Sequence, residues 1–259
     1  MPLTQVIVLA LVQGITELLP ISSSAHLVVV PMIFNWPDQG LTFDVALHVG
    51  TLLAIGLYFF KDWVDILLHK RRLLGYLILA TIPAAIVGAS LEHLVETTLR
   101  SPIVIGFNAI TIALVMWWAD SRSRTDRPLD QVTLKDSMLI GCAQALAVVP
   151  GVSRSGITIT TALFRNMKRE AAARFSFLLA TPIVAGAGLK KAFEMRHTGI
   201  PADMQVPFLL GMAVAAASGY LVIAFFLRYL QTRTLKIFIY YRLAFGIIVL
   251  ILAILARPN

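Results

Sequence analysis

The chain has 259 residues, of which 58% are hydrophobic and 14% are charged, and its formal net charge is +8. Soluble domains carry about 25% charged residues, so this composition excludes an ordinary water-soluble domain and indicates a membrane protein. The positive charge does not indicate nucleic-acid binding, because the basic residues lie in short loops between apolar runs. The single cysteine, Cys142, excludes an intramolecular disulfide and a multi-cysteine metal site.

The first apolar region, residues 3–34, is interrupted by PISSS at 20–24, and only ten residues follow before it ends. About 20 apolar residues are needed to cross a membrane as a helix, so we predict a re-entrant hairpin here. The segment lacks the basic region and cleavage site of a signal peptide, so we expect it in the mature protein. Three predicted full spans follow, at residues 42–60, 73–91 and 102–119.

The second half of the chain repeats this order. Residues 134–164 are apolar but interrupted by PGVSRSG at 150–156, and three predicted spans follow at 171–189, 206–227 and 235–256. Each half, about 1–120 and 134–259, therefore has one hairpin and an odd number of crossings. We predict a single all-α membrane domain with six full spans and two re-entrant hairpins, built as an inverted-topology repeat.

The basic residues give an independent indication of orientation, because Lys and Arg accumulate in the cytoplasmic loops of membrane proteins. In the inverted arrangement, sixteen of the 22 Lys and Arg residues, Arg242 among them, are assigned to inner segments and five to outer segments. Arg154 alone is assigned to membrane depth. The first hairpin then enters from outside and the second from inside, and their tips should meet near the midplane. Non-helical backbone at that depth is stable only beside protein or a wet cavity, so a functional site is expected there.

The first interruption is preceded by two polar side chains on one helical face, Gln13 and Glu17, which are four residues apart. Serines fill the interruption, and His26 follows it. Glu17 could serve only as a structural hydrogen-bond partner, and His26 could be a core or interfacial histidine. Ionisable groups at membrane depth are costly and usually functional, which favours a site.

The second interruption has the features of an anion-binding loop. Pro150 and Gly151 end one helix, Gly156 allows close approach of the backbone to a ligand, and Ser155 is a candidate cap for the next helix. The exposed amides of a helix start attract anions.

Arg154 adds a permanent planar cation that matches phosphate oxygens. A buried arginine requires a counter-anion, so either Glu17 or a bound phosphate must balance its charge. A purely structural Arg154–Glu17 pair that joins the two halves is the alternative.

A hydroxyl beside a base and a phosphate-binding cation suits nucleophilic attack or oxyanion binding. The hydroxyls expected to converge there are Ser22, Ser23, Ser24, Ser153 and Ser155. Three other polar residues in predicted spans, Asp44, His48 and Asn108, are interpreted as packing or supporting groups.

The segments QGITELLPISSSAH and PGVSRSGIT resemble the two signature motifs of the bacterial undecaprenyl-pyrophosphate phosphatase family, and FDVALHVGTLLA and ARFSFLLATP stand where that family has similar sequences. The resemblance spans the whole chain. It implies a hydrolase of the bacterial cytoplasmic (inner) membrane that removes the terminal phosphate from undecaprenyl pyrophosphate. The product is the lipid carrier for peptidoglycan synthesis, and bacitracin resistance is the associated phenotype.

The family's motifs map onto individual residues of this chain. The catalytic residues predicted from the motifs are Glu17, Ser23, His26 and Arg154. The predicted substrate-binding residues are Gln13, Ser22, Ser24, Gly151, Ser153, Ser155 and Thr158. The resemblance also implies dependence on Mg²⁺ or Ca²⁺, with Glu17 and substrate oxygens as the ligands. Gln13 stands where some members have a second glutamate, so one carboxylate ligand is absent.

The expected partners are undecaprenyl pyrophosphate and membrane lipid, with the pyrophosphate reaching the hairpin tips from the outer, periplasmic face. The sequence leaves the oligomeric state open, a homodimer included. Ser23 is the candidate nucleophile, with Glu17 or His26 as its base, and direct attack by an activated water is the competing scheme. A transporter or flippase for a lipid phosphate or another anion is the alternative function, because inverted repeats with broken helices are a transporter architecture.

Overall fold

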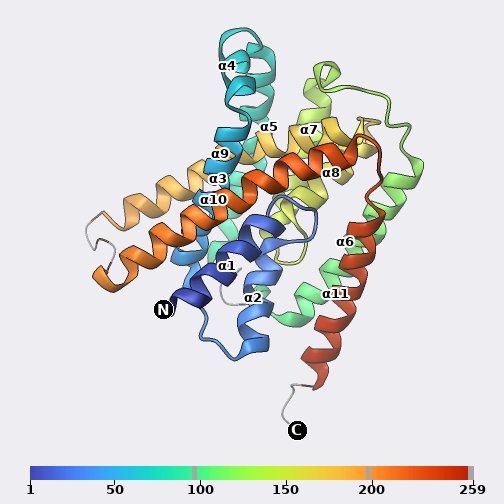
Figure 1. The fold of residues 1–259 in the computed structure, drawn as a ribbon. Helices are drawn as coiled ribbons and strands as arrows, with labels where there is room; N and C mark the ends of the chain where they lie inside the picture. Colours follow the sequence, from blue (N-terminus) through green and yellow to red (C-terminus); the bar gives the residue numbers. More distant parts are fainter. Residues whose placement is uncertain (95–97, 197–198, 200, 256–259) are drawn as a thin grey trace.

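The computed structural model describes residues 1–94, 98–196, 199 and 201–255. Over this part of the chain the protein is helical, and its only β-type pairing is an isolated parallel bridge between Arg127 and Met167. Figure 1 shows long tilted helices that cross near the middle of the molecule, with both termini toward its lower side. The α-helices are α1 (Leu3–Thr16), α2 (Ser23–Phe34), α3 (Gly40–Tyr58), α4 (Phe60–Leu68), α5 (Arg71–Leu94), α6 (Pro102–Arg122), α7 (Leu134–Ala145), α8 (Arg154–Phe164), α9 (Arg169–Glu194), α10 (Ala202–Leu230) and α11 (Lys236–Leu255). Two short 3-10 helices, η2 (Leu129–Gln131) and η3 (Leu146–Val148), complete the described elements.

Five of these helices, α5, α6, α9, α10 and α11, are long and apolar enough to cross a membrane. They correspond to the last five predicted spans, of which the final one, 235–256, extends one residue beyond the described part of the chain. The first predicted span, 42–60, corresponds to α3, which is followed by α4 at a bend of 70°. A sixth span is present only if this bent pair is counted as one. An all-helical protein with multiple apolar helices is thus confirmed.

Both predicted interruptions are breaks between helices. Chain segment 17–22 separates α1 from α2, and segment 149–153 separates η3 from α8. Ser22 and Ser153 precede the second helix of each pair with φ values of 76° and 72°, a left-handed conformation that is uncommon for non-glycine residues. Gly151 has a φ of +90°, and an added Cβ would lie 2.6 Å from the carbonyl oxygen of Ile105. Only glycine satisfies both constraints there.

Helices from the two halves of the chain pack on each other in pairs: α1 lies against α10 and α7 against α5, while α6 pairs with α11 and α3 with α9. A glycine permits each of the first two contacts. An added Cβ at Gly14 would lie 2.8 Å from the Ala215 oxygen, and one at Gly141 would lie 2.2 Å from the Ala80 oxygen. Small residues at these crossings let the backbones approach closely, as is common between membrane helices.

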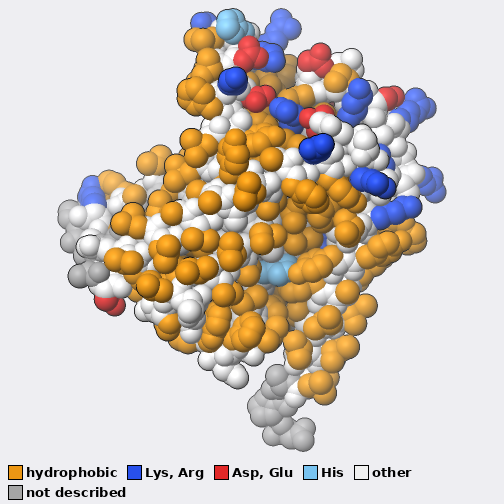
Figure 2. All heavy atoms as spheres, viewed as in Figure 1, with side chains coloured by type: hydrophobic (Ala, Val, Ile, Leu, Met, Phe, Trp, Pro, Cys, Tyr) orange, Lys and Arg blue, Asp and Glu red, His pale blue; other side chains and the backbone are white. Residues whose placement is uncertain are grey.

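The surface is divided by side-chain type. Figure 2 shows Lys and Arg gathered mainly at the end of the molecule that carries α4 and the α6–α7 connection, while hydrophobic side chains cover the middle. Some of the latter are very exposed, such as Leu57 at 67% and Leu221 at 68%. A surface of this kind suits a hydrocarbon environment, because large contiguous apolar surfaces are rare on soluble monomers.

Ion pairs hold the loops at this basic end. Asp136 accepts from Arg127 and Arg165, each at 2.7 Å, and it also caps α7 together with Thr133. Burial by itself would raise the pKa of Asp136, but the hydrogen bonds from these partners outweigh it and hold the pKa well below its usual range. On α6, Asp120 pairs with Arg169 at 2.6 Å.

The assignment of Arg242 to an inner segment was wrong. Its side chain is fully buried in α11 and donates to the carbonyl oxygens of Pro20, at 3.2 Å, and Gly151, at 2.7 Å. It also reaches the oxygens of Val152, at 3.2 Å, and Ala109, at 3.3 Å. Charge counting overlooks such a residue because it does not consider which helix face a side chain occupies. Arg242 joins both interruptions, whose carbonyl groups would otherwise lack helical partners.

Candidate active site

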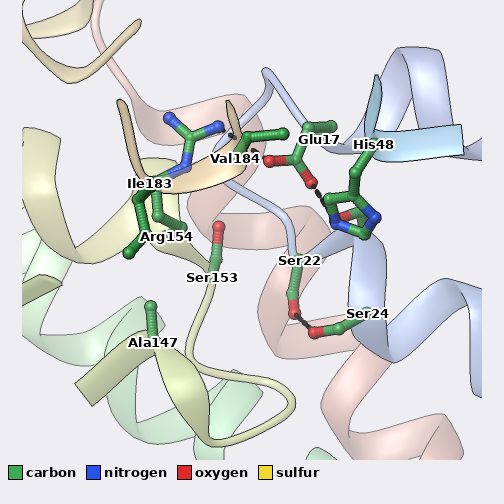
Figure 3. Close-up of a pocket in the computed structure, with 10 residues that line it drawn as sticks. Glu17, Ser22, Ser24, His48, Ala147, Ser153, Arg154, Ile183 and Val184 are labelled. Atoms are coloured by element: carbon green, nitrogen blue, oxygen red, sulfur yellow. Dashed lines mark hydrogen bonds and ion pairs between the residues drawn. The ribbon is translucent and has the colours of Figure 1, made fainter. Parts of the chain in front are cut away.

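Glu17, at the end of α1, is the centre of a polar cluster in the interior. One carboxylate oxygen, Oε1, accepts from Nη2 of Arg154 at 2.7 Å. The other, Oε2, accepts from the Ser23 hydroxyl and from Nε2 of Gln13 at 3.3 Å. Figure 3 shows Glu17 and Arg154 directed toward each other from different halves of the chain. The structure therefore brings together the carboxylate and the guanidinium that the sequence placed at separate hairpin tips.

Arg154, the first residue of α8, is held by a second element as well. Its Nη1 donates to the Ser176 carbonyl oxygen in α9 at 3.1 Å. Thr158 hydrogen-bonds both the Arg154 carbonyl and the Ser176 hydroxyl at 2.7 Å. Thr158 thus acts on the site by fixing Arg154, and its hydroxyl has no further proton to offer a ligand.

The two serines beside Arg154 differ in their roles. Ser153, not Ser155 as expected, caps α8, because its Oγ accepts from the Gly156 amide at 3.1 Å. Ser155 donates to the carbonyl oxygens of Leu19, at 2.9 Å, and Glu17, at 3.2 Å. Ser155 therefore stabilises the first interruption.

A cavity of about 160 Å³ opens beside this cluster. It is lined by Glu17, Ser22, Ser23, Ser24, His48, Ala147, Ser153, Arg154, Ile183 and Val184. Six of the predicted site residues thus share one cavity, and apolar side chains from η3 and α9 complete the wall. The remaining predicted site residues, Gln13, His26, Gly151, Ser155 and Thr158, are not part of this lining. A cation, a carboxylate and hydroxyls beside apolar groups suit a phosphorylated lipid headgroup.

Comparison with known proteins agrees with this geometry. Residues 6–248 match the family described as "Bacitracin resistance protein BacA". The chain belongs to this family. It is 44% identical to a protein named "Undecaprenyl-diphosphatase" of Pelotomaculum thermopropionicum, over 98% of this chain and 97% of that protein. Proteins of the same name from Moorella thermoacetica and Geobacter sulfurreducens are 47% and 48% identical, over 94% and 92% of this chain and 95% and 94% of theirs.

His26 does not contact Ser23 or Glu17 in this BacA-family protein. Its Nδ1 is 2.7 Å from the Ser22 carbonyl oxygen, its Nε2 is 2.6 Å from the Tyr241 hydroxyl, and its ring stacks on Phe245 at 4.3 Å between centroids. Both ring nitrogens have partners, and neither partner is Ser23 or Glu17. In this conformation His26 holds the left-handed Ser22 against α11, so the base nearest to Ser23 is Glu17.

His48 of α3, which the sequence suggested only as a supporting group, lines the cavity instead. Its Nε2 lies 3.3 Å from Oε2 of Glu17, and its Nδ1 lies 2.7 Å from the Asp44 carbonyl oxygen. A carbonyl oxygen and a carboxylate oxygen can only accept, so both ring nitrogens carry a hydrogen and the ring is an imidazolium beside Glu17. The sequence signal was the i, i+4 pair Asp44 and His48 within an apolar segment, but it does not show which helix faces α3.

The described residues do not fit a resident Mg²⁺ or Ca²⁺ ion. No group of three or more His, Cys, Asp or Glu side chains among them could hold a metal. Both oxygens of Glu17 already accept hydrogen bonds, and Arg154 lies against one of them. Gln13 has one buried oxygen without a partner, but its side chain is outside the cavity lining. We therefore assign no metal ligand, and dependence on a divalent ion stays a prediction from the resemblance.

Proposed function

We propose that the protein hydrolyses undecaprenyl pyrophosphate to undecaprenyl phosphate and inorganic phosphate, and thereby recycles the lipid carrier for peptidoglycan synthesis. The observation that carries this proposal is the Glu17–Arg154 contact of 2.7 Å beside the Ser23 hydroxyl, within a cavity that also has an apolar wall. Membership of the BacA family and the name of its relatives agree with it. Bacitracin resistance is the phenotype expected of such an enzyme.

In the proposed mechanism, the terminal phosphoryl group binds at Arg154, whose charge stabilises the phosphoryl oxygens in the transition state. The Ser23 oxygen attacks phosphorus while its proton passes to Glu17. The bond between this phosphorus and the bridging oxygen breaks, and undecaprenyl phosphate leaves. Water then attacks the phosphoserine, the Ser23 oxygen recovers the proton from Glu17, and dihydrogen phosphate is released.

The proposed topology keeps six spans and two re-entrant hairpins in the bacterial cytoplasmic membrane, with the halves 1–120 and 134–259 inverted. The reciprocal packing of α1 on α10 and of α7 on α5 supports the repeat. The serines that precede α2 and α8 also support the repeat, because Ser22 and Ser153 both have a positive φ. In each case the hydroxyl lies 3.3 Å from that of the serine two residues later in the chain, Ser24 or Ser155. The end rich in Lys and Arg faces the cytoplasm, and the cavity opens toward the outer face.

His48 is proposed to orient Glu17 and to add a hydrogen-bond donor beside the reacting phosphate. We expect His48→Ala to lower kcat about tenfold to a hundredfold, the usual effect of removing one hydrogen bond to a charged group. His48→Gln, which keeps a donor in this position, is expected to lose less. Both are measured as phosphate release from undecaprenyl pyrophosphate in detergent. An alanine variant as fast as the wild type would remove His48 from the mechanism.

The enzyme and the alternative transporter can be distinguished in detergent, because micelles do not separate two compartments and transport cannot be observed there. We expect purified protein to release inorganic phosphate from undecaprenyl pyrophosphate in detergent micelles. A carrier would instead move the lipid or an anion across sealed vesicles and leave the anhydride bond intact. Transport without phosphate release by the same preparation would contradict the proposed hydrolysis.

A further inference from the structure

A second cavity, of about 340 Å³, lies at the basic end of the molecule and shares no residue with the candidate active site. It forms where the last turn of α6 meets the last turn of α8. Its lining consists of Trp118, Arg122, Ser123, Leu163, Phe164 and Asn166. The proposed phosphatase mechanism uses none of these residues.

One wall of this cavity is aromatic and accessible from outside. The rings of Trp118 and Phe164 meet edge to face at 5.1 Å between centroids. Trp118 is 59% exposed, and its neighbour Trp117 is also more than half exposed. The candidate span of α6 ends at Arg122, one turn later, so these rings lie where the helix leaves the hydrocarbon. Tryptophan is enriched at this level of membrane proteins, where it contacts both acyl chains and headgroups.

The opposite part of the lining is polar and positively charged. Arg122 is exposed and forms no ion pair within the described part of the chain. The acidic residue nearest in sequence, Asp120, is already paired with Arg169 and also accepts from the Leu235 amide. Asn166 accepts from the Arg124 amide through Oδ1, which leaves its amino group as a donor. The carboxyl ends of α6 and α8 repel anions slightly, so the attraction must come from Arg122.

We propose that this cavity binds the headgroup of an anionic phospholipid. The lipid phosphate contacts Arg122 and the Asn166 amino group, and the glycerol and first acyl carbons lie along Trp118 and Phe164. Basic cavities between membrane helices bind anionic headgroups in this way, since the charge of the lipid and the apolar contact act together. The proposal does not depend on the chemistry at Glu17 and Arg154.

The test is lipid binding to the full-length protein in detergent, measured by native mass spectrometry with phosphatidylglycerol and phosphatidylcholine of identical acyl chains. The wild type is expected to bind phosphatidylglycerol about fivefold more tightly, the contribution of one arginine near a charged headgroup. Arg122→Gln should abolish this preference, and Trp118→Ala should weaken binding of both lipids. Phosphate release by both variants should remain at the wild-type level, which shows that they are folded.

The matched control is Arg228→Gln, which removes the same charge from an exposed residue in the last turn of α10, outside this cavity. It should leave the phosphatidylglycerol preference intact. The proposal is overturned if the wild type shows no preference, or if Arg228→Gln lowers it as much as Arg122→Gln does. Displacement of phosphatidylglycerol by an equal concentration of inorganic phosphate would also overturn it, because the site would then bind the free anion rather than a lipid.

Discussion

Arg154→Ala should lower kcat/KM for phosphate release from undecaprenyl pyrophosphate by about 10³-fold or more, the range seen when an arginine is removed from a phosphoryl-transfer site. The side chain lines the cavity and is fixed on both sides, by Glu17 at 2.7 Å and by the Ser176 carbonyl oxygen at 3.1 Å. It is therefore already positioned before substrate binds. A preorganised cation is most effective where water is excluded, because no reorganisation is needed as charge develops.

The controls for this variant separate lost catalysis from lost folding. Removing the arginine leaves Glu17 buried without its cation, which costs about 3–5 kcal/mol in typical cases. The double variant Arg154→Ala with Glu17→Gln removes that unpaired charge and should recover thermal stability without recovering activity. Arg154→Lys keeps the charge but not the planar fork, so it should retain partial activity. Turnover of Arg154→Ala within tenfold of the wild type would contradict the assigned role.

The sequence predicted the helical membrane class and the two interruptions because both depend on local composition. Runs of about 20 apolar residues indicate spans wherever they occur, and PISSS and PGVSRSG stop such runs with proline, glycine and serine. The contact between Glu17 and Arg154 could also be anticipated. Each would be an uncompensated charge at membrane depth, so the two had to meet or share a ligand.

The parts that the sequence did not predict depend on which face of a helix meets its neighbours. Hydropathy ended the first span at residue 60, close to the end of α3, but it did not predict the helix α4 that follows after a bend of 70°. The sequence indicated His26 as a catalytic residue and His48 as a supporting group, but His48 is the histidine that lies beside Glu17. The reason is that α2 directs His26 toward Tyr241 of α11, while α3 directs His48 into the cavity. Arg242 was assigned to an inner segment, although its partners are backbone carbonyls from three distant segments. Such partners cannot be predicted from residue identity, because every residue has a backbone carbonyl group.

Ser23→Ala is the variant that distinguishes covalent catalysis from direct attack by water. Because the Ser23 hydroxyl donates to Glu17 and lines the cavity, it is positioned to lose its proton as it attacks phosphorus. If it is the nucleophile, Ser23→Ala should lower kcat by about 10³-fold or more, as removal of a nucleophile does in other hydrolases. Acid-quenched wild-type enzyme should then yield a peptide with phosphoserine at Ser23.

The neighbouring Ser24 provides the matched control for this experiment. Its hydroxyl lines the same cavity, but its side-chain contact is with Ser22, at 3.3 Å, and not with Glu17. Ser24→Ala should therefore lower kcat by at most tenfold to a hundredfold. This corresponds to about 1.5–3 kcal/mol, the contribution of one hydrogen bond to a charged ligand. If Ser23→Ala lowers kcat no more than Ser24→Ala does, and no phosphoserine forms, Ser23 only binds substrate. Glu17 would then activate water, and the contact between Glu17 and Arg154 would remain the feature on which hydrolysis depends.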